Sequence, residues 1–289
     1  MFNKIRKNRK PSKTALKVAL NIITLSAKPG MEKILPAGIV EATEKLLLSS
    51  GVLGATSLRW SRSQRMVSVY KAFDWMLPGQ FEAFAHRKAF CERQVRDGIG
   101  AGATQIVVLG AGYDTLGWRL APEFHRVNFF EIDSPATARL KNRGIKAMGR
   151  RENLYLIAED LGKRKLGDVL KTTTSWDESA RTVIVAEGLV MYLPPEAVRD
   201  LFYQCAAIAG IGSRIVFSYI PTGADGRHDA GRWTGLMLWL QRFSGEPWLW
   251  SIQPEKLGSF LKETGWTYSR ELSGESVRHG VEFFSVATT

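Results

Sequence analysis

The chain contains few of the residues that bind metal ions or form disulfides. Among its 289 residues are two cysteines and four histidines. Cys91 and Cys205 fall on apolar stretches with helical spacing, and the histidines show no spacing typical of metal ligands. We therefore expect neither a disulfide framework nor a metal site. Scarce cysteine suits a reducing compartment, so a cytoplasmic location is expected.

Long apolar runs are also missing, and none reaches the roughly eighteen residues that a membrane-spanning helix needs. The apolar stretch 18–27 follows basic residues, as in a signal peptide. However, Asn21 interrupts it, and Lys28-Pro29-Gly30 is not a small-residue cleavage site. With 45% hydrophobic and 24% charged residues, the composition is typical of a globular protein with one large domain.

Positive charge is concentrated at the start of the chain. The net charge is +12, and seven basic residues lie within the first 17 positions, where there is no acid: Lys4, Arg6, Lys7, Arg9, Lys10, Lys13 and Lys17. Residues 1–13 are interpreted as a basic tail. Such a tail is either simply solvated or in contact with an anionic surface, which nucleic acid and membranes both offer.

Hydrophobic periodicity divides the rest of the chain into two parts. Residues 14–100 have helical spacing and form a predicted N-terminal helical cap, and residues 101–289 form the predicted core. In the core, five short runs that suit a parallel sheet covered on both faces are predicted as strands: 105–109, 126–132, 153–158, 182–186 and 213–219. A helix follows the fourth run, beginning at Pro194-Pro195 and ending at Gly210.

Two alternating runs, 266–270 and 281–287, predict a hairpin at the end of the core. Five βα units followed by a hairpin are typical of the class I methyltransferase sheet, whereas a doubly wound dehydrogenase more often continues with a sixth parallel strand. The predicted fold is therefore α/β and Rossmann-like, with seven mostly parallel strands and an antiparallel C-terminal hairpin.

An insertion at about 221–254 separates the fifth strand from the hairpin and contains four of the nine tryptophans: Trp233, Trp239, Trp248 and Trp250. Residues 232–243 are expected to form an amphipathic helix. The insertion is interpreted either as a lid that shapes an apolar pocket or as a segment whose aromatic residues pack on the core.

A glycine turn follows the first predicted strand, in the sequence Leu109-Gly110-Ala111-Gly112-Tyr113-Asp114-Thr115. The next strand ends in two acids, Glu131 and Asp133. This arrangement predicts a site for an adenosine-containing ligand, because glycine admits the ligand to the backbone and the acid accepts hydrogen bonds from ribose hydroxyls. Both a dinucleotide and S-adenosylmethionine fit that description.

Asp114 and Thr115 favour S-adenosylmethionine. The dinucleotide fingerprint requires glycine where Thr115 stands, and the Asp114 carboxylate would repel a pyrophosphate. A cationic sulfonium without phosphate groups meets no such repulsion. The alternative for Asp114 is that it only caps the following helix.

Several ordered motifs resemble the leucine carboxyl methyltransferase family. They are the glycine turn with Trp118-Arg119-Leu120, the segment 130–135 (FEIDSP), Glu159-Asp160-Leu161 and the segment 186–194 (AEGLVMYLP). Ser12-Lys13-Thr14-Ala15 is similar to the N-terminal opening of bacterial members. The resemblance covers residues 12–289. Bacterial members are S-adenosylmethionine-dependent O-methyltransferases, often associated with polyketides or other secondary metabolites.

The resemblance implies which residues contact each part of the cofactor. Arg87 would pair with the methionyl carboxylate, and the backbone at Gly110 and Gly112 would contact the amino-acid part. Asp133 would accept from the ribose hydroxyls, with Glu131 in support.

The resemblance further places Asp160 and Leu161 against adenine and Glu187 beneath the methionyl end. This sequence departs from the family's usual pattern at Leu116-Gly117, at Ser134 and around 145–152. These departures leave the cofactor contacts in place and the substrate open.

The expected reaction is an in-line transfer of a methyl group to oxygen. A carboxylate acceptor needs no base, whereas a hydroxyl acceptor does. Tyr192 and His228 are the only candidate bases that the sequence offers, so it favours a carboxylate or an acidic hydroxyl.

The predicted function is O-methylation of an apolar small molecule that carries a carboxylate or hydroxyl. Methylation of a protein C-terminal carboxylate is an alternative by family analogy. An NAD-dependent oxidoreductase is disfavoured by Thr115 and the hairpin. The remaining alternative is a nucleic-acid- or membrane-binding protein that uses the basic tail and keeps a vestigial cofactor fold.

Overall fold

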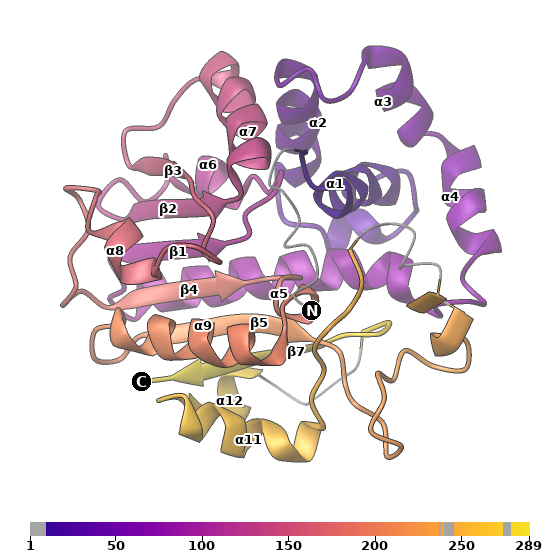
Figure 1. The fold of residues 1–289 in the computed structure, drawn as a ribbon. Helices are drawn as coiled ribbons and strands as arrows, with labels where there is room; N and C mark the ends of the chain where they lie inside the picture. The colour runs from indigo at the N-terminus through magenta and orange to yellow at the C-terminus, as the bar shows by residue number, and fades with distance from the viewer. Residues whose placement is uncertain (1–9, 237, 240–245, 274–278) are drawn as a thin grey trace.

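The structure, a computed structural model, describes residues 10–236, 238–239, 246–273 and 279–289. Its centre is a seven-stranded sheet with the order β3-β2-β1-β4-β5-β7-β6 (Figure 1). The five parallel strands are β1 (Gln105–Leu109), β2 (Asn128–Asp133), β3 (Leu154–Ala158), β4 (Thr182–Ala186) and β5 (Arg214–Tyr219). The predicted strands are confirmed to within two residues at each end.

The C-terminal hairpin is confirmed as well. Strand β7 (Phe283–Thr288) runs antiparallel to β5 and to β6 (Thr267–Tyr268). Strand β6 is shorter than the predicted run 266–270, because the short helix α12 (Arg270–Ser273) begins there. This sheet is the one predicted for a class I methyltransferase.

Burial explains why these runs form a sheet with both faces covered. Every residue of β1, β4 and β5 is buried, and β-branched residues dominate β1 and β4. One face is covered by α5 (Gln80–Gly100), α6 (Leu116–Leu120), α7 (Pro135–Met148) and α12. The other face is covered by α8 (Leu166–Leu170), α9 (Pro195–Ala207) and α11 (Pro254–Glu263).

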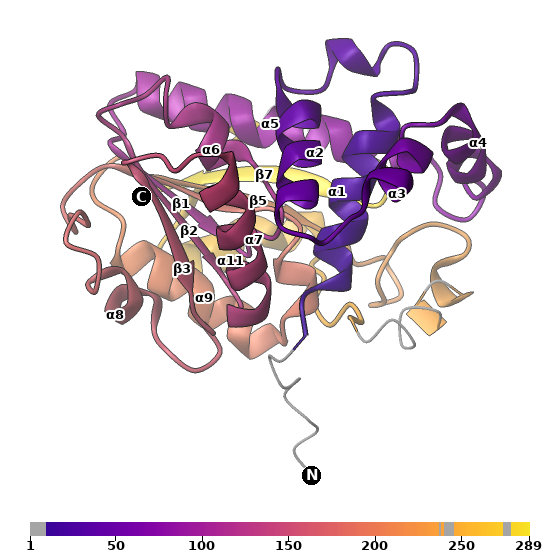
Figure 2. The same cartoon turned by 90° about the horizontal axis from the view of Figure 1, so that it is seen from above.

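Four N-terminal helices stand to one side of the sheet, as Figure 2 shows most clearly. They are α1 (Lys13–Leu25), α2 (Ile39–Ser49), α3 (Ala55–Ser61) and α4 (Gln64–Ala72), with the 3-10 turn η1 (Met31–Lys33) after α1. Helix α5 begins after Gly79, as its Pro78-Gly79 break predicts, and packs on the sheet through Phe90 and Val95. The last helix of the 14–100 segment therefore forms part of the layer that covers the core.

Three predicted features lie wholly or partly outside the described residues. The basic tail is described only from residue 10. Of the expected helix 232–243, residues 237 and 240–243 are not described, and residues 234–236 and 238–239 are helical. Part of the hairpin turn, 274–278, is also outside. In the part of the chain that is described, no helix is both long and apolar enough to cross a membrane.

The sheet order places a crevice at the carboxyl ends of β1 and β4. The chain leaves β1 toward β2 on one side, whereas β4 lies on the other side, so the connections diverge from this point. Ligands of open α/β sheets bind at such topological switch points. Helices α1 and α5 lie beside the carboxyl ends of these strands in both views (Figures 1 and 2).

Candidate functional site

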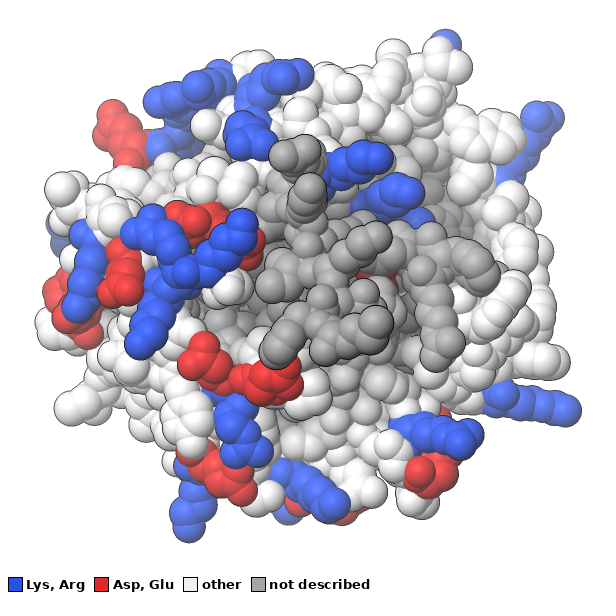
Figure 3. All heavy atoms as spheres, viewed as in Figure 1, with Lys and Arg blue, Asp and Glu red and all other residues white. Residues whose placement is uncertain are grey.

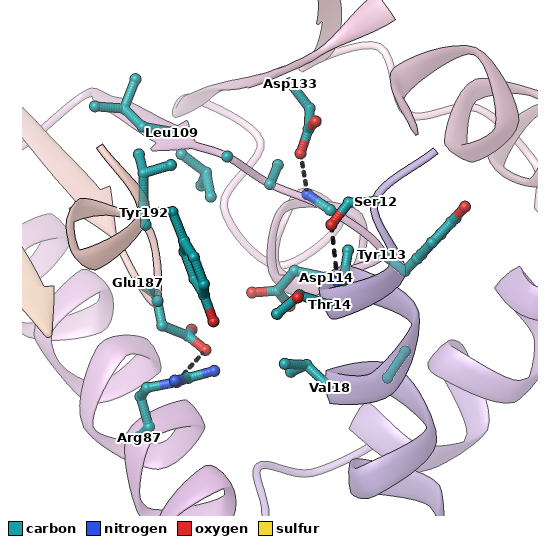
Figure 4. Close-up of a pocket in the computed structure, with 18 of the residues that line it drawn as sticks. Ser12, Thr14, Val18, Arg87, Leu109, Tyr113, Asp114, Asp133, Glu187 and Tyr192 are labelled. Carbon is teal, nitrogen blue, oxygen red and sulfur yellow. Dashed lines mark hydrogen bonds and ion pairs between the residues drawn. The ribbon is translucent and has the colours of Figure 1, made fainter. Parts of the chain in front are cut away.

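A cavity of about 340 Å³ opens at this switch point (Figure 4). Its walls come from the turns after β1, β2 and β4, from α1, α2 and α5, and from Glu246 of the insertion. Residues more than 200 positions apart in the chain therefore meet around one space. The size and position are those of a small-molecule site.

The glycine turn forms one wall with its backbone. Gly110 and Gly112 have φ values of +64° and +48°, in the left-handed region that favours glycine. A Cβ atom on Gly110 would lie 3.0 Å from a methyl group of Leu189, and one on Gly112 would lie 3.0 Å from Cβ of Ala15. Glycine at both positions thus lets the chain turn tightly and keeps this wall open to a ligand.

Asp133 is held against the glycine turn. Its Oδ2 accepts a hydrogen bond from the Gly112 amide at 2.6 Å, and its Oδ1 accepts from the Ser134 amide at 2.6 Å. Both are charge-assisted bonds to backbone donors. The carboxylate is therefore fixed at the end of β2 on the cavity wall, which is the place that the sequence predicts for a ribose-binding acid.

Five ionised side chains form a buried ion cluster on the α5 side of the cavity: Arg87, Lys88, Asp114, Glu187 and Glu282. Arg87 donates from Nε to Glu187 at 2.9 Å and from Nη1 to Glu282 at 2.6 and 2.8 Å. Lys88 Nζ donates to Asp114 at 2.8 Å and lies 2.9 Å from Glu187. Two cations and three anions leave the cluster with a formal charge of −1.

Pairing within the cluster shifts the pKa of Arg87, Lys88 and Asp114 toward their charged forms. Burial lowers the pKa of Arg87 and of Lys88, but the neighbouring carboxylates outweigh it and raise both above their ordinary values. Burial raises the pKa of Asp114, but Lys88, Lys141 and Arg119 outweigh it and hold that pKa well below its usual range. Mutual pairing therefore offsets the cost of removing these charges from water.

The Asp114 carboxylate accepts hydrogen bonds from two groups, one at each oxygen. Its Oδ1 accepts from the Leu116 amide at 3.0 Å, which is the capping role considered from the sequence. Its Oδ2 binds Lys88. The carboxylate is thus part of the cavity wall as well as a cap of α6.

Tyr192 projects into the cavity from the 3-10 turn η2 (Val190–Tyr192) (Figure 4). Burial raises the pKa of its phenol above the ordinary value. The hydroxyl therefore stays protonated at neutral pH and is suited to donate a hydrogen bond, not to act as a base.

The start of α1 is tied to the insertion beside the cavity. Glu246 accepts from Ser12 Oγ at 3.1 Å through Oε1, and through Oε2 it accepts from the Thr14 amide at 2.9 Å and from the Thr14 hydroxyl. We call this contact the Glu246 clasp. It joins segments 232 to 234 positions apart, both of which line the cavity.

The structure brings six of the ten predicted site residues into the cavity wall: Arg87, Gly110, Gly112, Asp133, Glu187 and Tyr192. The other four lie outside the lining that the described residues form, and each has a visible reason.

Glu131 lies beneath the glycine turn instead of on the cavity wall. It is buried, its Oε2 lies 2.7 Å from Lys141 Nζ, and its Oε1 accepts from the Gly117 amide at 3.2 Å. Burial raises its pKa, and Lys141 opposes that rise. Lys141 also donates to the Ala111 carbonyl at 3.3 Å, so Glu131 supports the turn from below.

Asp160 and Leu161 sit in the turn after β3. Asp160 Oδ1 accepts from the Gly162 amide at 3.1 Å, which is the pattern of an Asx turn. Leu161 packs against the core beside α8 and α9. Their adenine contacts stay a prediction.

His228 lies in the insertion, with its ring 6.3 Å from that of Trp248. Burial lowers its pKa, and Nε2 has no hydrogen-bond partner among the described residues. The structure thus separates this candidate base from the cavity.

Three site residues were missed by sequence reasoning. Lys88, Glu246 and Glu282 belong to none of the motifs in the sequence. Their partners are distant in sequence, up to 234 positions, and no local pattern marks such a pair.

The family comparison identifies the chain. The model of the family described as "Leucine carboxyl methyltransferase" matches residues 44–206. The chain belongs to this family. This confirms the resemblance drawn from the sequence motifs.

Relatives within the leucine carboxyl methyltransferase family support the assignment. A protein of Mycobacterium avium is 30% identical over 235 residues, covering 78% of this chain and 73% of the relative. One of Mycobacterium marinum is 34% identical over 150 residues, covering 51% and 47%. Both are named "Putative S-adenosyl-L-methionine-dependent methyltransferase". The chain spans about half the length of several curated relatives that it matches: 57% of one from Mycolicibacterium gilvum and 47% of those from Mycobacterium marinum and Mycobacterium ulcerans.

A solved structure shows the same fold as this leucine carboxyl methyltransferase family member. It is the crystal structure of a protein from Thermobifida fusca titled "putative methyltransferase", with a TM-score of 0.58 and 16% sequence identity. The alignment covers 90% of this chain and 97% of that one. At this identity the likeness supports the class I methyltransferase fold alone.

Proposed function

We propose that this protein is an S-adenosylmethionine-dependent O-methyltransferase that methylates the carboxylate, or a hydroxyl, of an apolar small molecule. Family membership and the names of the relatives support methyl transfer. The observation that carries the proposal is the cavity, in which the glycine turn, Asp133 and the buried ion cluster face one space.

The residues present fit S-adenosylmethionine. The open backbone at Gly110 and Gly112 leaves room that a Cβ atom would fill. Asp133 offers carboxylate oxygens where ribose hydroxyls would lie. Arg87 Nη2 has no hydrogen-bond partner among the described residues and can meet the methionyl carboxylate.

Charge supports the same ligand. At neutral pH the cofactor carries a sulfonium, an ammonium and a carboxylate, and so a net charge of +1. The buried ion cluster carries −1, with Glu187 and Asp114 on the cavity wall. A dinucleotide would bring its negative pyrophosphate toward those same carboxylates.

Bound S-adenosylmethionine would supply an electrophilic methyl group on a positively charged sulfur. The protein's own contribution is to orient the two reactants in line and to exclude water from the reacting atoms. The Glu246 clasp and α1 cover the cavity and suit that task.

The lining favours an acceptor that is already anionic. No histidine or cysteine lies among its described residues, and Tyr192 is protonated at neutral pH. The carboxylates of Asp114, Glu187 and Glu246 are each engaged by hydrogen-bond donors. A carboxylate acceptor needs no proton removed, so it fits this cavity better than an ordinary hydroxyl.

The rest of the cavity wall suits an apolar acceptor. Val18, Ala19 and Ile22 of α1 and Ile39 of α2 line it on the side away from β1. A small carboxylic acid with a hydrophobic body, such as secondary metabolism produces, would bury that body here.

Cofactor binding and acceptor chemistry are tested separately. Calorimetric titration with S-adenosylmethionine and with NADH should give micromolar binding of the first alone; binding of NADH alone would overturn the proposal. Methyl transfer from radiolabelled cofactor is then measured with libraries of apolar carboxylic acids, phenols and peptides. A methyl ester releases volatile labelled methanol in base, whereas a methyl ether does not. Label in peptides alone would favour a protein C-terminal carboxylate.

A further inference from the structure

One flank of the molecule exposes large aromatic side chains. Trp60 of α3, Phe73 and Trp75 after α4, and Trp233 and Trp239 of the insertion are each between 39% and 58% exposed. We call these five residues the aromatic flank. Exposed aromatic residues gathered in this way mark an interaction surface more often than an ordinary solvated one.

The aromatic flank joins segments that are distant in sequence. The ring of Trp75 meets that of Trp233 edge-on, with centroids 5.1 Å apart. In both Figure 1 and Figure 2, α3 and α4 stand together at the edge of the molecule remote from the free edge strand β3. The contact between Trp75 and Trp233 therefore joins the cap and the insertion on this side of the molecule.

The insertion turns apolar side chains both inward and outward. Leu238 packs inward against the cluster that contains Met191 and Ile220. Trp233, Leu236 and Trp239 are exposed. Since residues three apart share one side of a helix, these three present an apolar face to the outside.

Positive charges accompany the aromatic flank. Arg59, Arg65, Lys71 and Arg232 are exposed and form no ion pair with another described residue. Asp74 is the only acid between residues 55 and 75. In Figure 3 the right-hand side of the molecule, where α4 lies in Figure 1, is mostly uncharged, with Lys and Arg side chains at its margins.

We propose that the aromatic flank docks on the surface of an anionic lipid bilayer. Tryptophan prefers the headgroup region of a membrane, and basic side chains beside it are attracted to anionic lipids. Exposed aromatic residues with cations nearby suit insertion among lipid headgroups. The basic tail, whose sequence precedes α1, adds positive charge for the approach. The inference does not depend on the proposed methyl transfer.

Flotation of the full chain with lipid vesicles tests this docking. We compare vesicles of phosphatidylcholine alone with vesicles containing one quarter phosphatidylglycerol, without cofactor. The protein is expected to float with the anionic vesicles, at least tenfold more than with neutral ones. The double variant Phe73→Ser/Trp75→Ser should lose most of this binding, as should Arg65→Glu/Lys71→Glu.

Ile211→Ser is the matched control, because Ile211 is 93% exposed and lies before β5, at the opposite end of the strands from the cavity. It should bind vesicles as the wild type does. Trp75 contacts Trp233, so Phe73→Ser alone is a second variant that leaves that contact intact. Circular dichroism and S-adenosylmethionine binding confirm that each variant folds.

Three results would overturn the proposal. The first is equal vesicle binding by the wild type and all flank variants, which would assign binding to the basic tail. The second is no vesicle binding at all. The third is a dimer in solution that the flank variants dissociate, which would make the flank an interface between copies of this chain. Failure of methyl transfer would change none of these readouts.

Discussion

Glu282 holds Arg87 through both of its carboxylate oxygens, at 2.6 and 2.8 Å from Nη1, across 195 positions of the chain. Glu282 immediately precedes β7, and Arg87 lies in the middle of α5. Glu187 accepts a hydrogen bond from Nε of the same guanidinium at 2.9 Å. Since a guanidinium is a rigid fork, these bonds fix the direction of the remaining donors toward the cavity. Glu282 is thus a positioning residue for the proposed cofactor site.

Replacement of Glu282 tests this positioning. Glu282→Gln should weaken binding of S-adenosylhomocysteine about tenfold to a hundredfold, the range expected when a hydrogen bond to a charged group is lost. Binding of 5′-methylthioadenosine, which lacks the methionyl carboxylate, should change little. Calorimetry with both ligands measures the difference. Glu271→Gln, an exposed acid on α12, is the control. Equal losses for both ligands would show that Glu282 acts only through stability.

Asp133 should be essential for cofactor binding. Asp133→Ala removes both the predicted ribose contact and the bond to the Gly112 amide, so the glycine turn loses its clamp. We expect the affinity for S-adenosylmethionine to fall about a hundredfold or more, from the loss of two or more charge-assisted hydrogen bonds. Calorimetry of this variant and of the control Asp168→Ala, an exposed acid on α8, measures the effect. Unchanged affinity in Asp133→Ala would contradict the site assignment.

The buried ion cluster should make stability sensitive to acid. The pKa of Asp114 is lowered in the folded state, so its contribution to stability is fully present above the unfolded value of about 3.9 and is lost as pH falls through the folded one. Asp114→Asn should lower the free energy of unfolding by about 3 to 5 kcal/mol at pH 7, because Lys88 loses one of its two buried carboxylate partners.

Urea unfolding at pH 7 and at pH 3 measures that dependence. The difference between wild type and Asp114→Asn should shrink at pH 3, because the Asp114 carboxylate of the unfolded chain, with a pKa of about 3.9, takes up a proton there and the folded one does not. Asp97→Asn, which changes an exposed acid near the end of α5 and outside the cluster, should show little difference at either pH. A constant difference for Asp114→Asn at both pH values would mean that the ionised carboxylate is not the source of the stability.

The Glu246 clasp should slow the release of cofactor. Glu246→Ala removes the acceptor that holds Ser12 and Thr14, so α1 would separate more readily from the insertion. We expect the dissociation rate of S-adenosylmethionine to rise roughly tenfold, the factor that corresponds to about 1.4 kcal/mol. Stopped-flow fluorescence measures it. Asp225→Ala, an exposed acid in the same insertion, should leave the rate unchanged. A clasp variant with wild-type release would exclude this role.

Local sequence patterns are sufficient to predict the sheet and the turn that carries the site. Runs such as 105–109 and 182–186 are apolar at every or nearly every position, and such runs form strands covered on both faces. The glycine turn and Asp133 are equally readable, because a turn with positive φ and an acid at a strand end are local features. Arg87 and Glu187 came from family motifs, which carry the same kind of short-range information.

Which charged side chains pair with one another follows only from the tertiary structure. Glu246 and Glu282 meet partners 195 or more positions away, and Lys88 meets Asp114 and Glu187 at 26 and 99 positions, so no periodicity relates these pairs. The tertiary structure also places Glu131 outside the cavity lining. Glu131 is buried beneath the glycine turn, where it pairs with Lys141. Local patterns follow from backbone geometry within a few residues, whereas the ion cluster and the clasp follow from the packing of whole elements.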